Sequence, residues 1–216
     1  VFNMKNNEMI IFGVKQVYLS NSQNVTIFPA DQKVLLKQNR NFDSKGVLKA
    51  GLFTMFGNDF KFEYDKFIVN LNNVDSVRMK ARAFEEDVHG EKPLMNVTSV
   101  LQKLNGTLEI DNPNNKSGVK PYSKYPIFNS TTNSYVYYDK KYIQRGLYTK
   151  EKFYFYLDPF TIDSLDNFSN EGIFFPGELN SAGIFPTIRE ALRLQPDYSL
   201  GFKIKTPPEG LPLYGG

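Results

Sequence analysis

The stretch FKFEYDKFIVNLNNVD, residues 60–75, decides how the chain folds. Its aromatic residues Phe60, Phe62 and Tyr64 alternate with charged residues, which is the period of a β-strand with one buried face. The stretch therefore predicts a strand whose even-numbered side chains point into a core.

The apolar positions change parity within this stretch. After Tyr64 they fall on odd numbers, at Phe67 and Val69. A slip of one residue turns every later side chain to the opposite face unless the strand bends. We therefore expect a bulge or structural corner at Asp65 and Lys66.

The same pattern returns in FYFYLDPFTIDSLDNF, residues 153–168. An offset of 93 positions aligns the two stretches and matches Asp65 with Asp158. Pro159 follows Asp158, and proline has no N–H to give to a strand ladder. A second structural corner is therefore predicted at Asp158 and Pro159.

A further block precedes each stretch. Gly51-Leu52-Phe53 stands before the first and Gly146-Leu147-Tyr148 before the second. Two blocks in the same order indicate a tandem duplication. We place its copies at approximately residues 34–84 and 136–180.

The composition favours an all-β chain. The 216 residues include 19 Phe and 13 Tyr but no Trp, and such residues suit half-buried sheet surfaces. We expect short strands stacked in a sandwich-like or solenoid-like arrangement, as a single all-β fragment over residues 1–216. Only residues 96–104 fit a helical face as well as a strand. The start at Val1 and the Pro- and Gly-rich ending favour a piece of a larger protein.

Charge and cysteine content argue against several classes of protein. The net charge is only +3 with both signs interspersed, which argues against nucleic acid as a partner. No apolar run approaches the roughly 18 residues of a transmembrane helix. The chain has no Cys, so disulfides and thiolate chemistry are excluded.

The sequence offers no catalytic constellation. It has no Gly-rich phosphate loop, no GxSxG elbow and no Cys nucleophile. Its single histidine, His89, lies among carboxylates in residues 85–91, but one histidine provides no ligand pair, and a solvated loop is favoured. Asp65 and Asp158 fit turn residues better than an acid/base pair. We expect no enzyme, no metal site and no cofactor.

Tyrosines supply the one feature with binding character. Tyr154 and Tyr156 replace charged residues of the first copy, and Tyr135 and Tyr137 lie nearby in the sequence. Exposed aromatic residues can form a platform for sugars or a patch for a partner protein. If a second layer covers this face, the same tyrosines are core residues, and the usual burial of aromatic side chains favours that alternative.

Four phrases carry a resemblance that spans most of the chain. They are LNGTLEIDNPNNKSG (104–118), YPIFNSTTNSYVYYDKKYIQ (125–144), FYFYLDPFTIDSLDNFS (153–169) and GIFP…LQPDYSLGF (183–202). Together they resemble segments of very long, uncharacterised β-repeat proteins of the cell envelope of Bacteroidota-type Gram-negative bacteria. The resemblance brings no catalytic residues with it.

The resemblance implies an extracytoplasmic setting, in the periplasm or at the outer membrane, and a slice of a much longer chain. Long β-repeat proteins of this kind are often similar to bridge-like lipid conduits, an analogy at the level of fold. We expect a non-catalytic structural segment, a scaffold or conduit, whose partners are other segments of the same chain, lipid or glycan. The alternative is a glycan- or protein-binding β module that uses the tyrosine-rich face. An enzyme acting on an envelope polymer would need an acid/base pair that the sequence does not offer.

Overall fold

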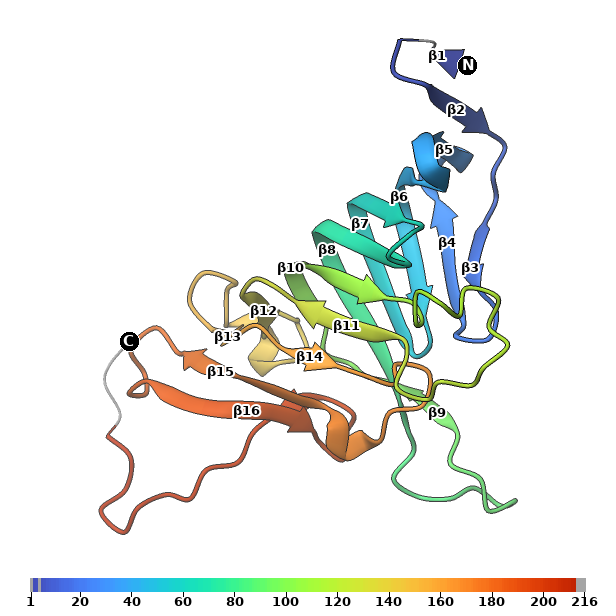
Figure 1. The fold of residues 1–216 in the computed structure, drawn as a ribbon. Coiled ribbons are helices and arrows are strands. Elements are labelled where there is room, and N and C mark those ends of the chain that lie inside the picture. The colour runs from blue at the N-terminus through green and yellow to red at the C-terminus, as the bar shows by residue number, and fades with distance from the viewer. Residues whose placement is uncertain (1, 4, 213–216) are drawn as a thin grey trace.

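The protein is all-β, as the sequence predicts. The structure is a computed structural model that describes residues 2–3 and 5–212. This part contains seventeen strands, four 3-10 turns and no α-helix, and none of its helical turns could span a bilayer. The strands form one large antiparallel sheet that does not close on itself (Figure 1).

The strands in chain order are β1 (Phe2–Asn3), β2 (Glu8–Phe12), β3 (Val17–Ser20), β4 (Val25–Pro29), β5 (Lys33–Leu36), β6 (Phe42–Ala50), β7 (Phe53–Glu63), β8 (Ile68–Arg82), β9 (Leu94–Asn96), β10 (Leu101–Glu109), β11 (Ile127–Ser130), β12 (Ser134–Tyr137), β13 (Tyr154–Leu157), β14 (Thr161–Ile162), β15 (Phe174–Asn180), β16 (Ile188–Leu194) and β17 (Leu200–Gly201). The 3-10 turns are η1 (Ala30–Gln32), η2 (Gln38–Arg40), η3 (Gln144–Gly146) and η4 (Asn170–Gly172).

The centre of the sheet runs through β6, β7, β8 and β10. On one side β6 pairs with β4, which carries β3, and with β5, which carries β2 and β1. On the other side β10 pairs with two strands, β11 over one part of its length and β12 over the other. From β11 the sheet continues to β14, and from β12 to β13, β15, β16 and β17.

The core lies against one face of this sheet, which we call the inner face. Alternation along each strand sends apolar side chains inward, and strand register aligns them in rows. One row, from β6 to β14, consists of Phe42, Phe62, Val69, Leu108, Phe128 and Ile162. A second, from β6 to β15, consists of Leu48, Met55, Val77, Leu101, Val136, Phe155 and Leu179. Every member of both rows is buried.

The C-terminal part of the sheet returns over the centre and gives a sandwich-like arrangement. The amide of Leu52 donates to the carbonyl oxygen of Leu165 at 2.8 Å. The rings of Phe53 and Phe168 lie 5.4 Å apart. The core is therefore enclosed between the central strands and the segment that follows β14.

The parity change at Asp65 is a chain reversal. Glu63 at the end of β7 pairs with Ile68 at the start of β8, and residues 64–67 form the turn between them. From Gly57 to Glu63, the paired positions of β7 and β8 add up to an odd number, so even residues of β7 share a face with odd residues of β8 there. Asp65 and Lys66 are exposed at the tip of this turn.

A line of irregularities, which we call the crease, crosses the sheet at one level. The strand register shifts beside Lys45 in β6, Asn58 in β7, Asn73 in β8 and Asn105 in β10. Side chains bridge the disturbed ladders: Asn105 Oδ1 accepts from the amide of Asn73 at 2.6 Å. The crease continues through the gap between β11 and β12, where Thr132 Oγ1 accepts from the amide of Asn105 at 3.1 Å.

The crease divides the sheet into two halves. The turn half contains the Asp65 hairpin, and the tyrosine half contains β12 and β13. Asp158 and Pro159 lie on the crease, in the gap between β13 and β14. The aligned positions Asp65 and Asp158 thus occupy different places, and β7 pairs with β8 whereas β13 pairs with β12 and β15. The tandem duplication stays a prediction from the sequence.

The ambiguous stretch 96–104 is extended, not helical. Leu101 begins β10, which pairs with β8 on one side and with β11 and β12 on the other. Lys103 within it has a φ of 59°, a left-handed conformation that locally displaces the strand. Pairing on both sides outweighs the helical spacing of its apolar residues.

Candidate binding surfaces

The four predicted tyrosines lie together on the outer face of the tyrosine half. Tyr135 pairs directly with Tyr156, and Tyr137 with Tyr154. Their neighbours Val136 and Phe155 point into the core, so the two-residue period of the strands turns the tyrosines outward. The sequence predicted this grouping only from their spacing along two separate stretches.

The tyrosine rings pack against one another. The ring centroids of Tyr135 and Tyr137 lie 5.6 Å apart with planes only 3° from parallel, and those of Tyr135 and Tyr156 lie 5.3 Å apart. All four side chains are half-buried, and within residues 2–3 and 5–212 every aromatic neighbour of each ring belongs to the same cluster. The cluster is thus a surface feature outside the core, and its rings are partly covered by each other.

Polar and cationic groups frame the tyrosine cluster. Lys103 Nζ lies 5.5 Å from the ring centroid of Tyr135, and Lys150 Nζ lies 5.3 Å from that of Tyr137. Asn180 Nδ2 donates to the hydroxyl of Tyr154 at 3.1 Å. A cation above an aromatic ring gains about 0.5–1 kcal/mol at an exposed site. Neither lysine could be assigned to the cluster from the sequence, because Lys103 lies on a different strand and Lys150 in a connecting segment.

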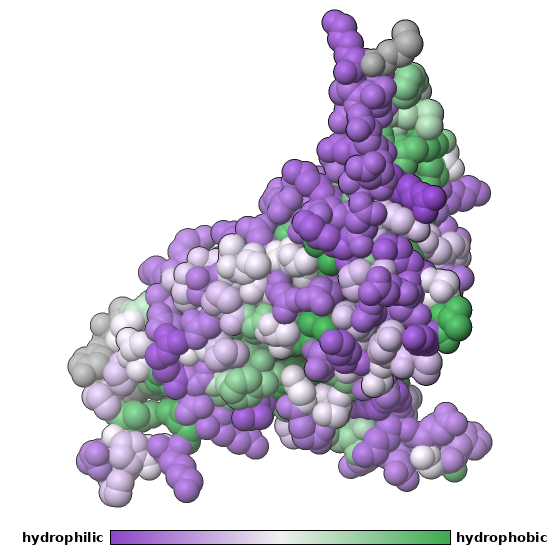
Figure 2. Space-filling view, viewed as in Figure 1, coloured by the Kyte–Doolittle hydropathy of each residue, from purple (hydrophilic) through white to green (hydrophobic). Residues whose placement is uncertain are grey.

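A second surface is the projection formed by β1, β2 and β5, which we call the blade (Figure 1). Its register continues an inner row outward from Phe42 to Leu36, Met9 and Phe2. Phe42 is buried, but Met9 is 37% and Phe2 56% exposed. Figure 2 shows hydrophobic side chains along one side of this projection and hydrophilic ones along the other. The apolar inner face of the sheet is therefore buried at Phe42 but continues onto the blade, where it is exposed to solvent.

A groove of about 430 Å³ lies at the base of the blade, beside Phe42, which pairs with Leu36 of the blade. Three phenylalanines of the inner face line it, together with β3 and Lys116 of the loop that follows β10. These are Phe42, Phe62 and Phe67. At this groove the three largely buried phenylalanines lie next to solvent.

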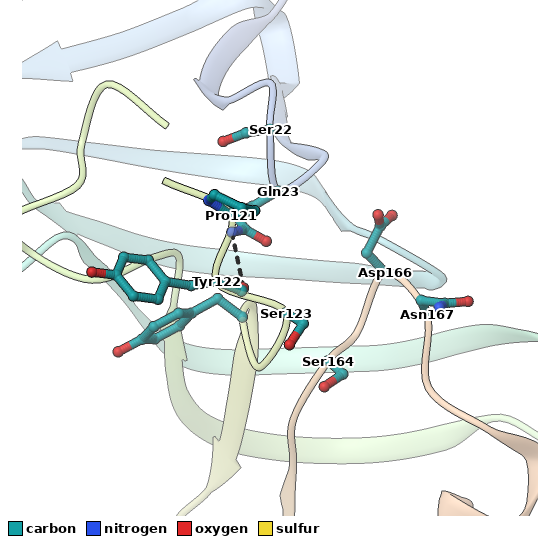
Figure 3. A pocket seen from close by; sticks show the side chains of 9 residues that line it. Ser22, Gln23, Pro121, Tyr122, Ser123, Ser164, Asp166 and Asn167 are labelled. Carbon is teal, nitrogen blue, oxygen red and sulfur yellow. Dashed lines mark hydrogen bonds between the residues drawn. The ribbon is translucent and has the colours of Figure 1, made fainter. Parts of the chain in front are cut away.

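A second hollow, of about 320 Å³, lies between residues 22–23, 121–125 and 164–167 (Figure 3). Gln23 Nε2 donates to the carbonyl oxygen of Tyr122 across it at 3.3 Å. Asp166 is the one carboxylate in its lining, and Asp166 Oδ1 accepts from Asn24 Nδ2 at 2.7 Å. A single carboxylate held by an amide cannot supply an acid/base pair.

The loop around His89 and the carboxylate of Asp158 have structural partners. In the exposed loop 85–91, Asp87 Oδ1 accepts from the amides of His89 and Glu91 at 2.8 and 3.0 Å. The described part of the chain brings no three metal-ligating side chains together. Asp158 Oδ2 accepts from Arg189 Nη2 at 2.5 Å, so its carboxylate ties β13 to β16.

Beside the cluster, Tyr138 follows β12 and turns the other way. It packs against the core and lies 5.9 Å from the ring of Phe153. Removal of its hydroxyl from water raises the pKa of Tyr138 to about 12, because burial disfavours the charged phenolate.

A comparison of the chain with protein-family models, curated proteins and solved structures found no match.

Proposed function

We propose that the chain is a non-catalytic structural segment of a larger cell-envelope β-repeat protein, and that a neighbouring segment of the same protein covers the blade. The observation that carries the proposal is the inner row that leaves the core at Phe42 and ends exposed at Phe2. The extracytoplasmic location comes from the sequence resemblance alone.

An apolar sheet face in water is unfavourable. Contiguous exposed apolar patches on a protein usually mark an interaction surface, and an uncovered strand edge invites further pairing. The blade combines both features, because its apolar side is in register with the core. A covering segment that continues the same inner row would bury Met9 and Phe2 as Phe42 is buried.

The groove at the base of the blade favours the conduit form of this proposal. Its phenylalanine lining and its volume of about 430 Å³ suit an acyl chain better than a polar ligand. In a scaffold, the neighbouring segment fills the groove. In a conduit, lipid occupies it.

Site-specific photo-crosslinking in cells tests the proposal. The complete reading frame is expressed with p-benzoyl-phenylalanine in place of Met9, and mass spectrometry identifies the adducts. Lys33, exposed on the opposite face of the same blade, is the control position. We expect intrachain adducts outside residues 1–216, or lipid adducts, from Met9 and not from Lys33. A reading frame of these residues alone, or identical adducts from both positions, would overturn the proposal.

A second function, glycan or protein binding by the tyrosine cluster, is favoured by a separate observation. Four half-exposed tyrosines stand side by side on the outer face, away from the core. Binding of wild type to immobilised oligosaccharides is compared with that of Tyr135→Ala and Tyr156→Ala. Loss of binding in both variants, with an unchanged circular dichroism spectrum, supports this function, and unchanged binding excludes it.

A further inference from the structure

The tyrosine cluster belongs to a longer strip on the outer face of the tyrosine half. Direct register pairs connect it, strand by strand, to β4 at the other side of the sheet. The strip consists of Phe28, Val47, Phe56, Ser76, Gln102, Tyr135 and Tyr156. Side chains in register on one face are immediate neighbours. We call this continuous row the outer strip.

Cations lie over the aromatic rings of the outer strip. Three such pairs are Lys49 over Phe28 at 5.1 Å, Arg78 over Phe56 at 5.2 Å and Lys103 over Tyr135 at 5.5 Å from the ring centroid. The positive groups therefore recur along the strip, each held near the sheet by a ring.

These cations have no carboxylate partner in the described part of the chain. No ion pair involves Lys49, Arg78 or Lys103. Across the crease the situation is reversed. There, Lys61 lies 3.4 Å from Asp59 and Lys66 lies 2.8 Å from Glu63. In the tyrosine half, Lys150 and Arg189 also form ion pairs, but the three cations over the outer strip do not.

We propose that the outer strip binds an acidic polysaccharide that lies across the strands. Lys49 and Arg78 occupy one cross-strand row and are separated by a single strand, with Thr54 between them. Two strand spacings separate them by about 9.5 Å, close to the length of a disaccharide. A linear glycan with at least one carboxylate in each disaccharide would meet both cations, and the tyrosine hydroxyls offer partners for its hydroxyl groups.

The same geometry disfavours two other anionic partners, single-stranded nucleic acid and an anionic membrane. Single-stranded nucleic acid relies on free aromatic faces for base stacking, whereas here cations cover faces of Phe28, Phe56 and Tyr135. An anionic membrane is bound best when apolar side chains insert beside the cations. None of the strip's aromatic side chains is among the highly exposed hydrophobic residues.

This inference rests on glycan binding by the tyrosine cluster. It adds that the glycan is acidic, that its binding site extends along the outer strip and that the glycan lies across the strands. The test is affinity electrophoresis through gels that contain polygalacturonate, carboxyl-reduced polygalacturonate or no polymer. Wild type is compared with the double variant K49Q/R78Q. The matched control, K61Q/K66Q, removes the same charge from the turn half. Melting temperatures verify that all three proteins are folded.

We expect polygalacturonate alone to retard wild type, and K49Q/R78Q to weaken binding at least tenfold while K61Q/K66Q stays within twofold. A parallel fall in both variants would indicate nonspecific charge and overturn the proposal. Equal retardation by the carboxyl-reduced polymer would leave glycan binding intact but overturn the acidic specificity. No retardation by either polymer would refute both glycan binding and acidic specificity. Tighter binding to a single-stranded oligonucleotide or to phosphatidylglycerol vesicles would also refute the proposal.

Discussion

Replacement of Phe62 by alanine tests where the core ends. Phe62 is 6% exposed, and its ring centroid lies 5.0 Å from that of Phe42 and 6.2 Å from that of Phe67. Emptying a buried phenylalanine site costs about 3–5 kcal/mol, part of which comes from the cavity left behind. Phe62 also lines the groove at the base of the blade, so water can enter the vacated space. We therefore expect the lower end, about 3 kcal/mol.

Phe53 provides the matched comparison. It is 1% exposed, packs against Phe168 and lies away from the groove, so Phe53→Ala leaves a closed cavity and costs about 4–5 kcal/mol. In a domain of this size, about 3 kcal/mol lowers the melting temperature by roughly 6–12 °C. Urea denaturation of wild type and both variants, with equal slopes, gives the two free energies of unfolding.

Tyr154→Ala completes the series. Tyr154 loses ring contacts at 5.6 and 6.2 Å and a hydrogen bond from Asn180, which together predict a loss of about 1–2 kcal/mol. The expected order of destabilisation is Phe53→Ala, Phe62→Ala, Tyr154→Ala. A Phe62→Ala protein as stable as wild type would refute burial at the groove. A Tyr154→Ala protein as unstable as Phe53→Ala would refute the outer-face position of the cluster.

Three further predictions concern separate parts of the molecule. Gly177→Ala places a Cβ 2.1 Å from the carbonyl oxygen of Tyr156 and is expected to cost more than about 2 kcal/mol, whereas Gly172→Ala, with its nearest contact at 3.8 Å, stays within about 0.5 kcal/mol; equal melting temperatures would contradict this. Asn115→Ala removes two hydrogen bonds of 2.8 Å donated to Asp111 and Lys120 and is expected to cost about 2–3 kcal/mol in urea denaturation; a loss below about 0.5 kcal/mol would contradict it. The pKa of Tyr138 is raised from 10.0 to about 12 in the folded protein, so stability present below pH 10 is lost as the pH rises towards 12; Tyr138→Phe is expected to flatten this loss in denaturation measured across that range, and an unchanged slope would argue against burial of the hydroxyl.

The sequence was sufficient to predict the strand class and the inward-facing positions. Alternation alone identified Phe60 and Phe62 as inward-facing, and both are buried. It also grouped the four tyrosines, because residues two apart on a strand must share a face. The parity change at Asp65 was visible, but alternation does not distinguish a hairpin from a bent strand. Only the partner strand decides between them.

The crease was beyond sequence reasoning for a physical reason. Asn58 and Asn73 belong to polar runs that are typical of turns, whereas in the structure they lie inside long strands. Asn73 adopts a φ of 58°, which asparagine tolerates better than most residues. The blade escaped notice for a different reason, because its apolar runs EMIIF and KVLL look the same as those of buried strands. Exposure depends on what covers a face, and no local pattern records that.

The crease has a geometric consequence for any chain that extends this sheet. Because it crosses neighbouring strands at one level, each added strand with a polar interruption at the same height would prolong the fold line by one strand spacing, about 4.8 Å. The width of the two halves of the sheet would stay constant, because it is set by the length of the strands on either side of Asn58, Asn73 and Asn105. A protein built this way sets its length by strand number and its cross-section by the position of its asparagines.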